Sequence, residues 1–231
     1  MKRLMENWRG YLSEEELDES LMLKKGKNGW WLYSQLVAEA YRTAPDMSKD
    51  LTPLYEEFGK WLEDEVARIR SRVKVIPTEK HPYTSAKQMR AQMRKTGKLY
   101  VSTSDATHPA WMGDQGLEWN TYFRAFHDFQ GHFGHGSRFS LQGEIAAYNN
   151  HVRMIPNAYV PILFTEVVGQ ISCFYHSKKD NCPQKVTELD DFDFFKVGAL
   201  TKKGEERFKY TLDKARKILV PIGDASGDDN V

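Results

Sequence analysis

The stretch LTPLYEEFGKWLEDEVARIRSR, residues 51–72, decides the fold class of this 231-residue chain. Its apolar side chains recur at steps of three and four residues, which places them along one face of an α-helix. Charged residues occupy the other faces. The segment therefore predicts a long helix that packs one side against a core. The residues expected on that side are Leu54, Phe58, Trp61, Leu62, Val66 and Ile69.

Helical patterns also dominate the rest of the chain. We expect further helices at residues 1–25, 30–41, 84–96, 118–131, 140–154, 160–177 and 203–219. Two short apolar stretches, 73–76 and 99–102, predict a pair of strands. Residues 103–116 predict a long loop, and the acidic, glycine-containing end 223–231 predicts a disordered tail.

The expected fold class is therefore mainly α, a single helical domain over residues 1–222 with a small two-stranded β ribbon. Its N-terminal helices fill residues 1–72. Helices between residues 118 and 177 carry most of the histidines and the polar residues that could perform chemistry.

Acidic and basic residues nearly balance, with 32 Asp and Glu against 33 Lys and Arg, so total charge points to no class of partner. Their distribution is uneven, since residues 66–98 contain ten Lys or Arg and a single acid, Glu79. Such a segment can form a face that holds the phosphate of a nucleic acid or nucleotide. The alternative is a solvated helix surface that balances the acidic N-terminal part.

Cysteine usage and hydropathy indicate the compartment. Cys173 and Cys182 are the two cysteines of the chain, and their number and spacing fit neither a disulfide framework nor a zinc ribbon. We expect Cys173, inside an apolar helical run, to be a small core residue. The charged N-terminus lacks a signal segment, and no apolar stretch approaches the roughly 20 residues of a membrane span. These features predict a soluble cytoplasmic protein without a membrane partner.

The run His127-Asp128-Phe129-Gln130-Gly131-His132 is the strongest indication of chemistry. On an ideal helix, residues five apart point about 140° away from each other. We expect Gly131 to end or bend the helix, so that His132 turns back toward His127. Two histidines with the carboxylate of Glu166 from a later helix make the ligand set of a mononuclear non-haem iron site, which leaves positions open for oxygen and substrate.

Other polar residues share helix faces with these ligands. Spacings of three, four and seven residues place Glu144, Tyr148 and His151 on one face, and Gln170 lies four residues after Glu166. We expect Glu144, Tyr148, His151 and Gln170 to lie directly behind the ligands, orienting them by hydrogen bonds, or to form the wall of the substrate site. Asp128 is expected to stabilise the turn that bears the histidines.

Buried charge of this kind requires a metal ion or polar partners. Three interpretations of the cluster stay open: a metal site, a polar active site without metal, and a structural hydrogen-bond network. The remaining histidines are isolated in the sequence. His81, His108 and His176 predict structural or surface positions, and His135, between two glycines, predicts a position that faces substrate or solvent.

The run from Phe126 to His132 resembles the metal-binding signature of the pterin-dependent aromatic amino acid hydroxylases. The third ligand of that family is a glutamate in an aromatic-Thr-x-Glu-aromatic-Gly segment. Phe164-Thr165-Glu166-Val167-Val168-Gly169 is similar, with one residue fewer between Thr and Glu. The resemblance covers residues 120–172 and implies a hydroxylase with Fe(II) held by His127, His132 and Glu166. It also implies a pterin co-substrate, although the quoted residues match the metal ligands alone.

A longer pattern resembles proteins encoded by bacterial viruses. It reads Arg124-Ala-Phe-His-Asp-x-x-Gly-His, then Gly143-Glu144, His151, and Thr165-Glu166-x-x-Gly-Gln170. The opening residues 5–12 resemble the leaders of proteins from tailed phages. This resemblance implies a location in the host cytoplasm and a substrate related to nucleotides or DNA bases.

Three functions are consistent with these observations. The first is a mononuclear non-haem iron(II) oxygenase, a monooxygenase acting on a nucleotide, a nucleobase or an aromatic small molecule, with residues 66–98 holding phosphate. The second is a hydrolase or transferase with a metal-activated water. Glu144 or Asp128 is its general base, and in one variant Glu144 and His151 bind a second metal. The third is a non-enzymatic phage accessory protein with a structural metal site.

Overall fold

A computed structural model describes residues 29–104, 108–111, 113–177 and 182–213 of the chain. The predicted helix at residues 1–25 and the predicted tail at 223–231 lie outside the described residues, as does the last part of the helix predicted at 203–219.

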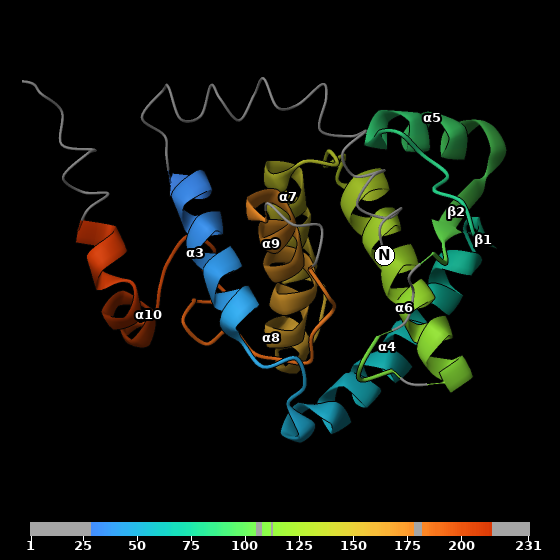
Figure 1. Cartoon of the computed structure of the whole chain (residues 1–231). Helices are drawn as coiled ribbons and strands as arrows, with labels where there is room; N and C mark the ends of the chain where they lie inside the picture. The colour runs from blue at the N-terminus through green and yellow to red at the C-terminus, as the bar shows by residue number, and fades with distance from the viewer. Residues whose placement is uncertain (1–28, 105–107, 112, 178–181, 214–231) are drawn as a thin grey trace, which may run out of the picture.

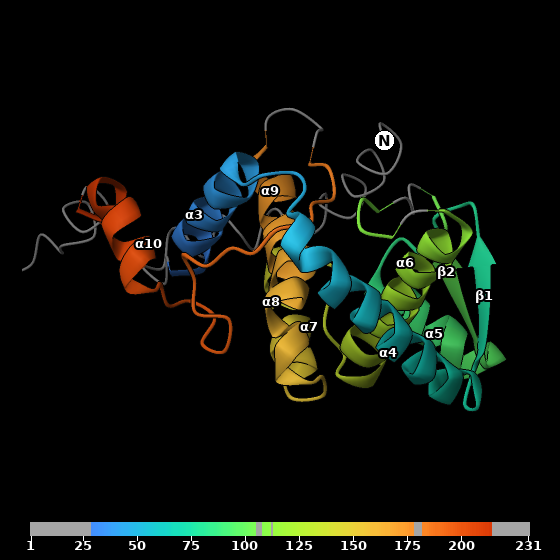
Figure 2. The ribbon, with the colours of Figure 1, turned by 90° about the horizontal axis from the view of Figure 1, so that it is seen from below.

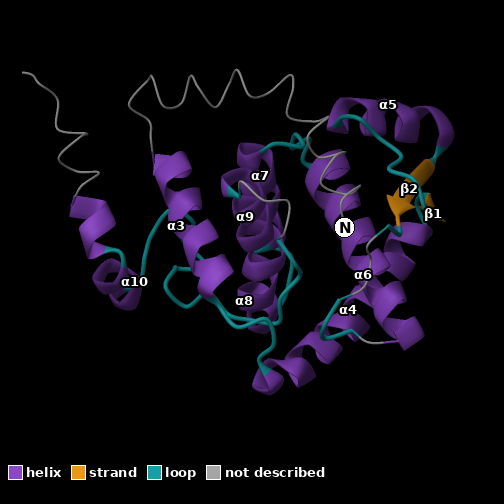
Figure 3. Ribbon diagram, in the orientation of Figure 1, coloured by secondary structure: helices purple, strands orange, loops and turns teal. Residues whose placement is uncertain are grey.

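The described part of the chain is mainly α with one small sheet, which confirms the predicted fold class (Figures 1 and 3). The α-helices are α3 (Gly29–Thr43), α4 (Thr52–Arg70), α5 (Ala86–Thr96), α6 (Gly113–His127), α7 (Leu141–His151), α8 (Val160–Leu163), α9 (Gln170–His176) and α10 (Lys202–Arg207). Two π-helices, Asp128–Gly134 and Phe164–Gly169, follow α6 and α8 directly. The loop predicted at 103–116 is shorter than expected, because α6 begins at Gly113.

Helix α4 buries the face that the sequence predicts. Phe58, Leu62, Val66 and Ile69 are buried, whereas Leu54 and Trp61 are half-buried at the edge of that face. The face packs against α6 and forms part of a large core cluster that extends from α3 to the region of α10. Each large side chain removed from water in this way contributes roughly 1.5–3 kcal/mol to folding.

The predicted strand pair consists of β1 (Lys74–Thr78) and β2 (Lys98–Ser102), which run parallel with Lys74 opposite Lys98. Parallel neighbours require a crossover connection, and α5 supplies it. The side chain of Ser85 caps the start of α5, and Gly97 ends the helix in the left-handed conformation with φ 65°, as its position predicts. The ribbon and α5 thus form one compact unit at the end of the molecule.

The helices lie in a row that both views resolve (Figures 1 and 2). From one end, α10 is followed by α3, then by α7, α8 and α9 together, then by α4 and α6, and finally by α5 with the strands. Helix α3 packs on α9, and α7 packs on the first π-helix. The candidate site lies between α6 with its π-helix on one side and the group of α7, α8 and α9 on the other.

Cys173 and Cys182 form a disulfide bond, so the expectation that the two cysteines are not paired is wrong. Both are buried, Cys173 in α9 and Cys182 in the segment that follows it. Cysteine spacing in a sequence can predict a framework of several disulfides. A single disulfide forms only where the fold brings its two cysteines together, which spacing does not predict. Disulfides are uncommon in reducing compartments, and the cytoplasmic location stays a prediction.

The helical segment Asn157–His176 is long and apolar enough to cross a membrane when judged by length and composition. It spans 20 residues, a length not expected from the sequence, and 67% of its most apolar window is buried inside the molecule. A core helix passes the same test, so the segment is a weak indication of a membrane span.

Candidate metal centre

The first π-helix brings His127 and His132 together. The N–H of His135 donates to the carbonyl of Gln130, five residues earlier, at 3.2 Å. A helix with hydrogen bonds between residues five apart has a wider turn than an α-helix, so side chains five apart in sequence come closer to one face. The expected end or bend at Gly131 is therefore wrong, because the helix continues and widens instead. The Nε2 atoms of the two histidines lie 3.0 Å apart.

Gly131 has a different role, which is to let this π-helix approach α7. A Cβ atom at position 131 would lie 2.8 Å from the Cβ of Ala147 and 3.2 Å from Nε2 of His151. Carbon atoms that are not bonded do not approach so closely without a shift of the backbone. Glycine therefore sets the distance between the helix that carries the two histidines and the helix that carries Glu144.

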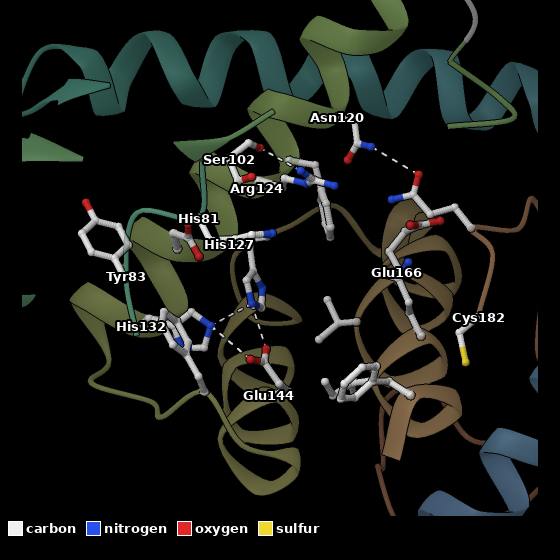
Figure 4. Close-up of a pocket in the computed structure, with 18 of the residues that line it drawn as sticks. His81, Tyr83, Ser102, Asn120, Arg124, His127, His132, Glu144, Glu166 and Cys182 are labelled. Atoms are coloured by element: carbon white, nitrogen blue, oxygen red, sulfur yellow. Dashed lines mark hydrogen bonds and ion pairs between the residues drawn. The ribbon is translucent and has the colours of Figure 1, made fainter. Parts of the chain in front are cut away.

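The carboxylate that contacts both histidines is that of Glu144, from α7 (Figure 4). Its Oε2 lies 2.9 Å from Nε2 of His127, and its Oε1 lies 3.4 Å from Nε2 of His132. Glu144 and His132 are almost completely buried. Three ligand-type side chains from three successive helical elements thus meet at one point.

The outer nitrogen atoms of both rings also have partners. Nδ1 of His132 lies 3.1 Å from the carbonyl of Ser137, and a carbonyl can only accept. Nδ1 therefore carries a proton, and Nε2 is the nitrogen atom that presents its lone pair to the centre whenever the ring is neutral. Nδ1 of His127 lies 3.1 Å from Nε2 of the buried His151. Such outer contacts orient metal-binding histidines in proteins.

Arg90 fixes the segment that provides one of these contacts. Its guanidinium donates to the carbonyls of His132, Gly136 and Ser137, each at 3.1 Å. The side chain comes from α5, inside the basic segment 66–98. This arginine therefore joins α5 to the end of the π-helix and holds the Ser137 carbonyl against the ring of His132.

Burial and electrostatic interactions shift the pKa values of the cluster. Burial raises the pKa of Glu144, but the charges of His132 and His127 outweigh burial and leave the pKa lowered. Burial lowers the pKa of His132, yet the Glu144 carboxylate outweighs it and the net shift is upward. Burial, followed by repulsion from His127, holds the pKa of His151 well below its ordinary value. The directions of these shifts favour an ionised Glu144, a proton on His132 and a neutral ring at His151.

The three side chains fit a divalent transition metal. With metal–ligand bonds of about 2.1 Å, ligand atoms lie about 3.0 Å apart along an octahedral edge and about 3.4 Å apart along a tetrahedral edge. The two Nε2 atoms here are 3.0 Å apart, Oε2 of Glu144 lies 2.9 Å from Nε2 of His127, and the other oxygen, Oε1, lies 3.4 Å from Nε2 of His132. In addition, Oε1 of Glu144 is buried without a hydrogen-bond partner. A cation among these atoms would satisfy that oxygen and the lone pairs of the rings together.

Asp128 adds a second carboxylate beside the histidines. One of its oxygen atoms and ring nitrogen atoms of His127 and His132 all lie within 4.8 Å of one another, a possible metal-binding group. Burial raises the pKa of Asp128, while His132 and His127 act in the opposite direction. Asp128 is half-buried and lines the cavity described below. It is therefore near enough to act as a ligand or as a base.

Glu166, the predicted third ligand, lies across the cavity from Glu144 (Figure 4). It belongs to the second π-helix, and its Oε1 accepts hydrogen bonds from Nε2 of His108 at 3.0 Å and from the hydroxyl of Tyr55 at 3.1 Å. His108 is buried, which excludes the surface position and leaves the structural one of the two positions expected for it. No sequence signal links His108 to Glu166. His108 lies in a loop and contacts the second π-helix only in the folded chain.

The other residues that were expected behind the ligands or in the substrate wall lie in different places. Gln170 lines the cavity. His151 lies behind His127 and has no part in the wall. Tyr148 points away from the site, since its hydroxyl donates to the carbonyl of Phe194 at 2.7 Å and its ring packs against Phe164. The helix face inferred for Glu144, Tyr148 and His151 therefore divides, because α7 is buried on two sides.

A cavity of about 200 Å³ adjoins the cluster. His127, His132, Glu144 and Asp128 line one part of it, and Glu166 and Gln170 another. Side chains from the loop 81–83, which lies inside the basic segment 66–98, also contribute to its wall. Most of the basic side chains of that segment are exposed. The exposed ones are Arg68, Arg70, Arg72, Lys74, Lys80, Lys87, Arg94 and Lys95.

Comparison with protein-family models, with curated proteins and with solved structures gives no match to this chain.

Proposed function

We propose that the protein binds a single divalent transition metal ion through His127, His132 and Glu144 and uses it to oxidise a small molecule in the adjacent cavity. The observation that carries this proposal is the convergence of two Nε2 atoms and one carboxylate at separations of 2.9 to 3.4 Å. Two histidines and one carboxylate are the ligand set of mononuclear Fe(II) oxygenases. The proposal keeps the ligand chemistry expected from the sequence and replaces Glu166 by Glu144.

In this role, Fe(II) would supply open coordination positions for dioxygen and a reducing co-substrate. The chain's own residues orient the site. Ser137 and His151 fix the two rings through their Nδ1 atoms, so that both Nε2 atoms point to Glu144. The mainly apolar wall excludes water from the reacting molecule. A pterin, a nucleotide, a nucleobase and an aromatic small molecule are the co-substrate and substrate classes to test first.

The test is metal content and oxygen uptake of anaerobically purified protein. Wild type is expected to hold about one iron per chain and to consume oxygen slowly in the ferrous form, and His127→Ala and Glu144→Ala are expected to lose both properties. His135→Ala is the matched control, because this nearby histidine is exposed. Iron content that is unchanged in His127→Ala would refute the site. Full iron content with no oxygen uptake would refute the oxygenase.

Asp128 favours a second candidate, a metal-dependent hydrolase. A second carboxylate within 4.8 Å of the histidine nitrogen atoms is placed to take a proton from a metal-activated water. This function predicts turnover of a phosphate or ester substrate with zinc or manganese under anaerobic conditions. Asp128→Asn would then abolish turnover while the metal content is unchanged. Binding of nucleic acid through residues 66–98 is a separate proposal that binding at low salt would test.

A further inference from the structure

Two groups of polar side chains on the cavity wall contain buried carboxylates, and the proposed function uses one of them. The metal cluster occupies one side. Glu166 lies on the other side, together with Asn120 and Gln184, whose side-chain amides are joined by a hydrogen bond of 3.3 Å (Figure 4). The wall between the two places is largely apolar. Its apolar residues include Phe123, Phe139, Val167, Ile171 and Phe174.

Two neutral donors hold one oxygen of the Glu166 carboxylate. Nδ1 of His108 accepts the N–H of Ala110 at 3.2 Å, so the ring is neutral and carries its proton on Nε2. Nε2 then donates to Oε1 of Glu166 at 3.0 Å, and the hydroxyl of Tyr55 donates to the same oxygen at 3.1 Å. Both hydrogen bonds therefore end on Oε1. They fix the direction of the carboxylate without neutralising it and leave Oε2 unused.

No described lysine or arginine lies at ion-pair distance from the carboxylate of Glu166. Arg124 also lines the cavity, and its guanidinium donates to the carbonyls of Ser102 and Ser104. His108 is the only described side chain at ion-pair distance from Glu166, and that ring is neutral by the argument above. The Glu166 side chain is only 3% exposed, so water does little to stabilise its charge. A buried carboxylate of this kind is stabilised by a positive partner. Glu166 lines the cavity, so a bound molecule can supply that partner.

We propose that Glu166 binds the protonated amine of a small substrate whose apolar body lies between it and the metal cluster. The size of the cavity limits that body. A cavity of about 150 Å³ holds benzene, and this one has about 200 Å³, which suits one ring with a short arm. The term substrate rests on the proposed function, whereas binding of the amine does not require the metal.

The test uses three probes of nearly equal shape, benzylammonium, benzyl alcohol and benzoate, titrated into the full-length chain. Metal-free protein and Zn(II)-loaded protein are titrated separately by calorimetry. Charge-assisted hydrogen bonds are strong enough that benzylammonium should bind at least about tenfold more tightly than either other probe. Glu166→Gln should abolish that preference. Glu188→Gln, which removes an exposed carboxylate of the same size, should retain it.

Tyr55→Phe provides a second, milder variant. It removes one of the two donors to Oε1 and keeps the buried ring, so the preference for the amine should fall a few-fold without loss of folding. Circular dichroism of each variant separates a binding defect from unfolding. If Tyr55→Phe prefers benzylammonium as strongly as wild type does, the hydroxyl of Tyr55 does not position the carboxylate.

Several outcomes would overturn the proposal. One is the absence of saturable benzylammonium binding to wild type. Another is equal binding of the three probes, or a preference that survives in Glu166→Gln. Loss of metal from Glu166→Gln to the extent seen in His127→Ala would instead identify Glu166 as a metal ligand. If wild type binds no metal but keeps its preference for the amine, the proposed function fails and the amine site stands.

Discussion

Nε2 of His151 lies 3.1 Å from Nδ1 of His127, on the side of the imidazole ring that faces away from Glu144. His151 is fully buried and its pKa is held well below the ordinary value, by burial first and by His127 second. A neutral ring can accept the proton of Nδ1, which leaves Nε2 of His127 free to bind a cation. In the proposed metal centre, His151 thus acts through another residue.

His151→Leu is expected to weaken metal binding about 10- to 100-fold, the usual effect of removing a residue that orients a ligand. His151→Gln, which retains a hydrogen-bond acceptor, should weaken it less. Competition with a chromogenic chelator measures both affinities. Equal metal affinity in wild type and His151→Leu would show that His151 has no influence on the ligand it contacts.

Metal affinity is expected to rise with pH. Burial lowers the pKa of His132, but Glu144 outweighs burial and holds the pKa above its ordinary value of 6.5. The ring must lose a proton before Nε2 can bind an ion. Affinity should therefore rise up to about tenfold per pH unit below the raised pKa and level off above it. Chelator competition between about pH 6 and 8 covers this window, and a flat profile would contradict the assignment.

The stability of the metal-free chain should change in the opposite direction. Because the pKa of His132 is raised on folding, its interaction with Glu144 contributes fully below pH 6.5 and is lost as the pH rises through the raised value. The lowered pKa of Glu144 sets the acid limit. The stabilisation that the ionised Glu144 provides is present above its ordinary pKa of 4.5 and is lost as the pH falls through the lowered pKa. Urea unfolding of wild type and of Glu144→Gln, each with a chelator present, measures the loss of stability at high pH and at low pH.

Gly131→Ala is expected to destabilise the fold by about 1–3 kcal/mol, the usual effect of overpacking. The added methyl group would meet the Cβ of Ala147 at 2.8 Å and push α7 away from the π-helix. Ala147→Gly removes the Cβ atom that the new methyl group would contact. The double variant should therefore recover part of the lost free energy of unfolding. Urea unfolding of the two single variants and the double variant gives the coupling energy. Additive effects would contradict the contact.

Reduction of the disulfide between Cys173 and Cys182 is expected to lower the free energy of unfolding by about 2–3 kcal/mol, the entropic effect of opening a short loop. Cys182→Ser should cause a similar loss. The melting temperature of Cys182→Ser should be the same with and without reductant, whereas the melting temperature of wild type should fall when reductant is added. A wild-type melting temperature that is unaffected by reductant would indicate that the bridge contributes nothing in solution.

The amino-acid sequence predicts the elements of this fold better than their contacts. The stripe on α4 and the strand pair follow from local periodicity, and the structure has both. The pairing of Glu144 with His127 and His132 does not follow from periodicity. Glu144 and Glu166 both lie on helices that face the histidines, and their positions in the cavity depend on tertiary packing. His108 could not be found for the same reason, since its loop reaches Glu166 only in the folded chain.

The two π-helices have a consequence for how the sequence can change. Each wide turn accommodates one residue more than an α-helical turn would. Removing a single residue between 128 and 134 would let the helix return to ordinary α geometry, and His132 would then rotate away from His127 while the apolar pattern around it stayed nearly intact. The same deletion between 164 and 169 would rotate Glu166 away from His108. The geometry of both side-chain clusters therefore depends on chain length within two short windows, a property that substitutions alone would not reveal.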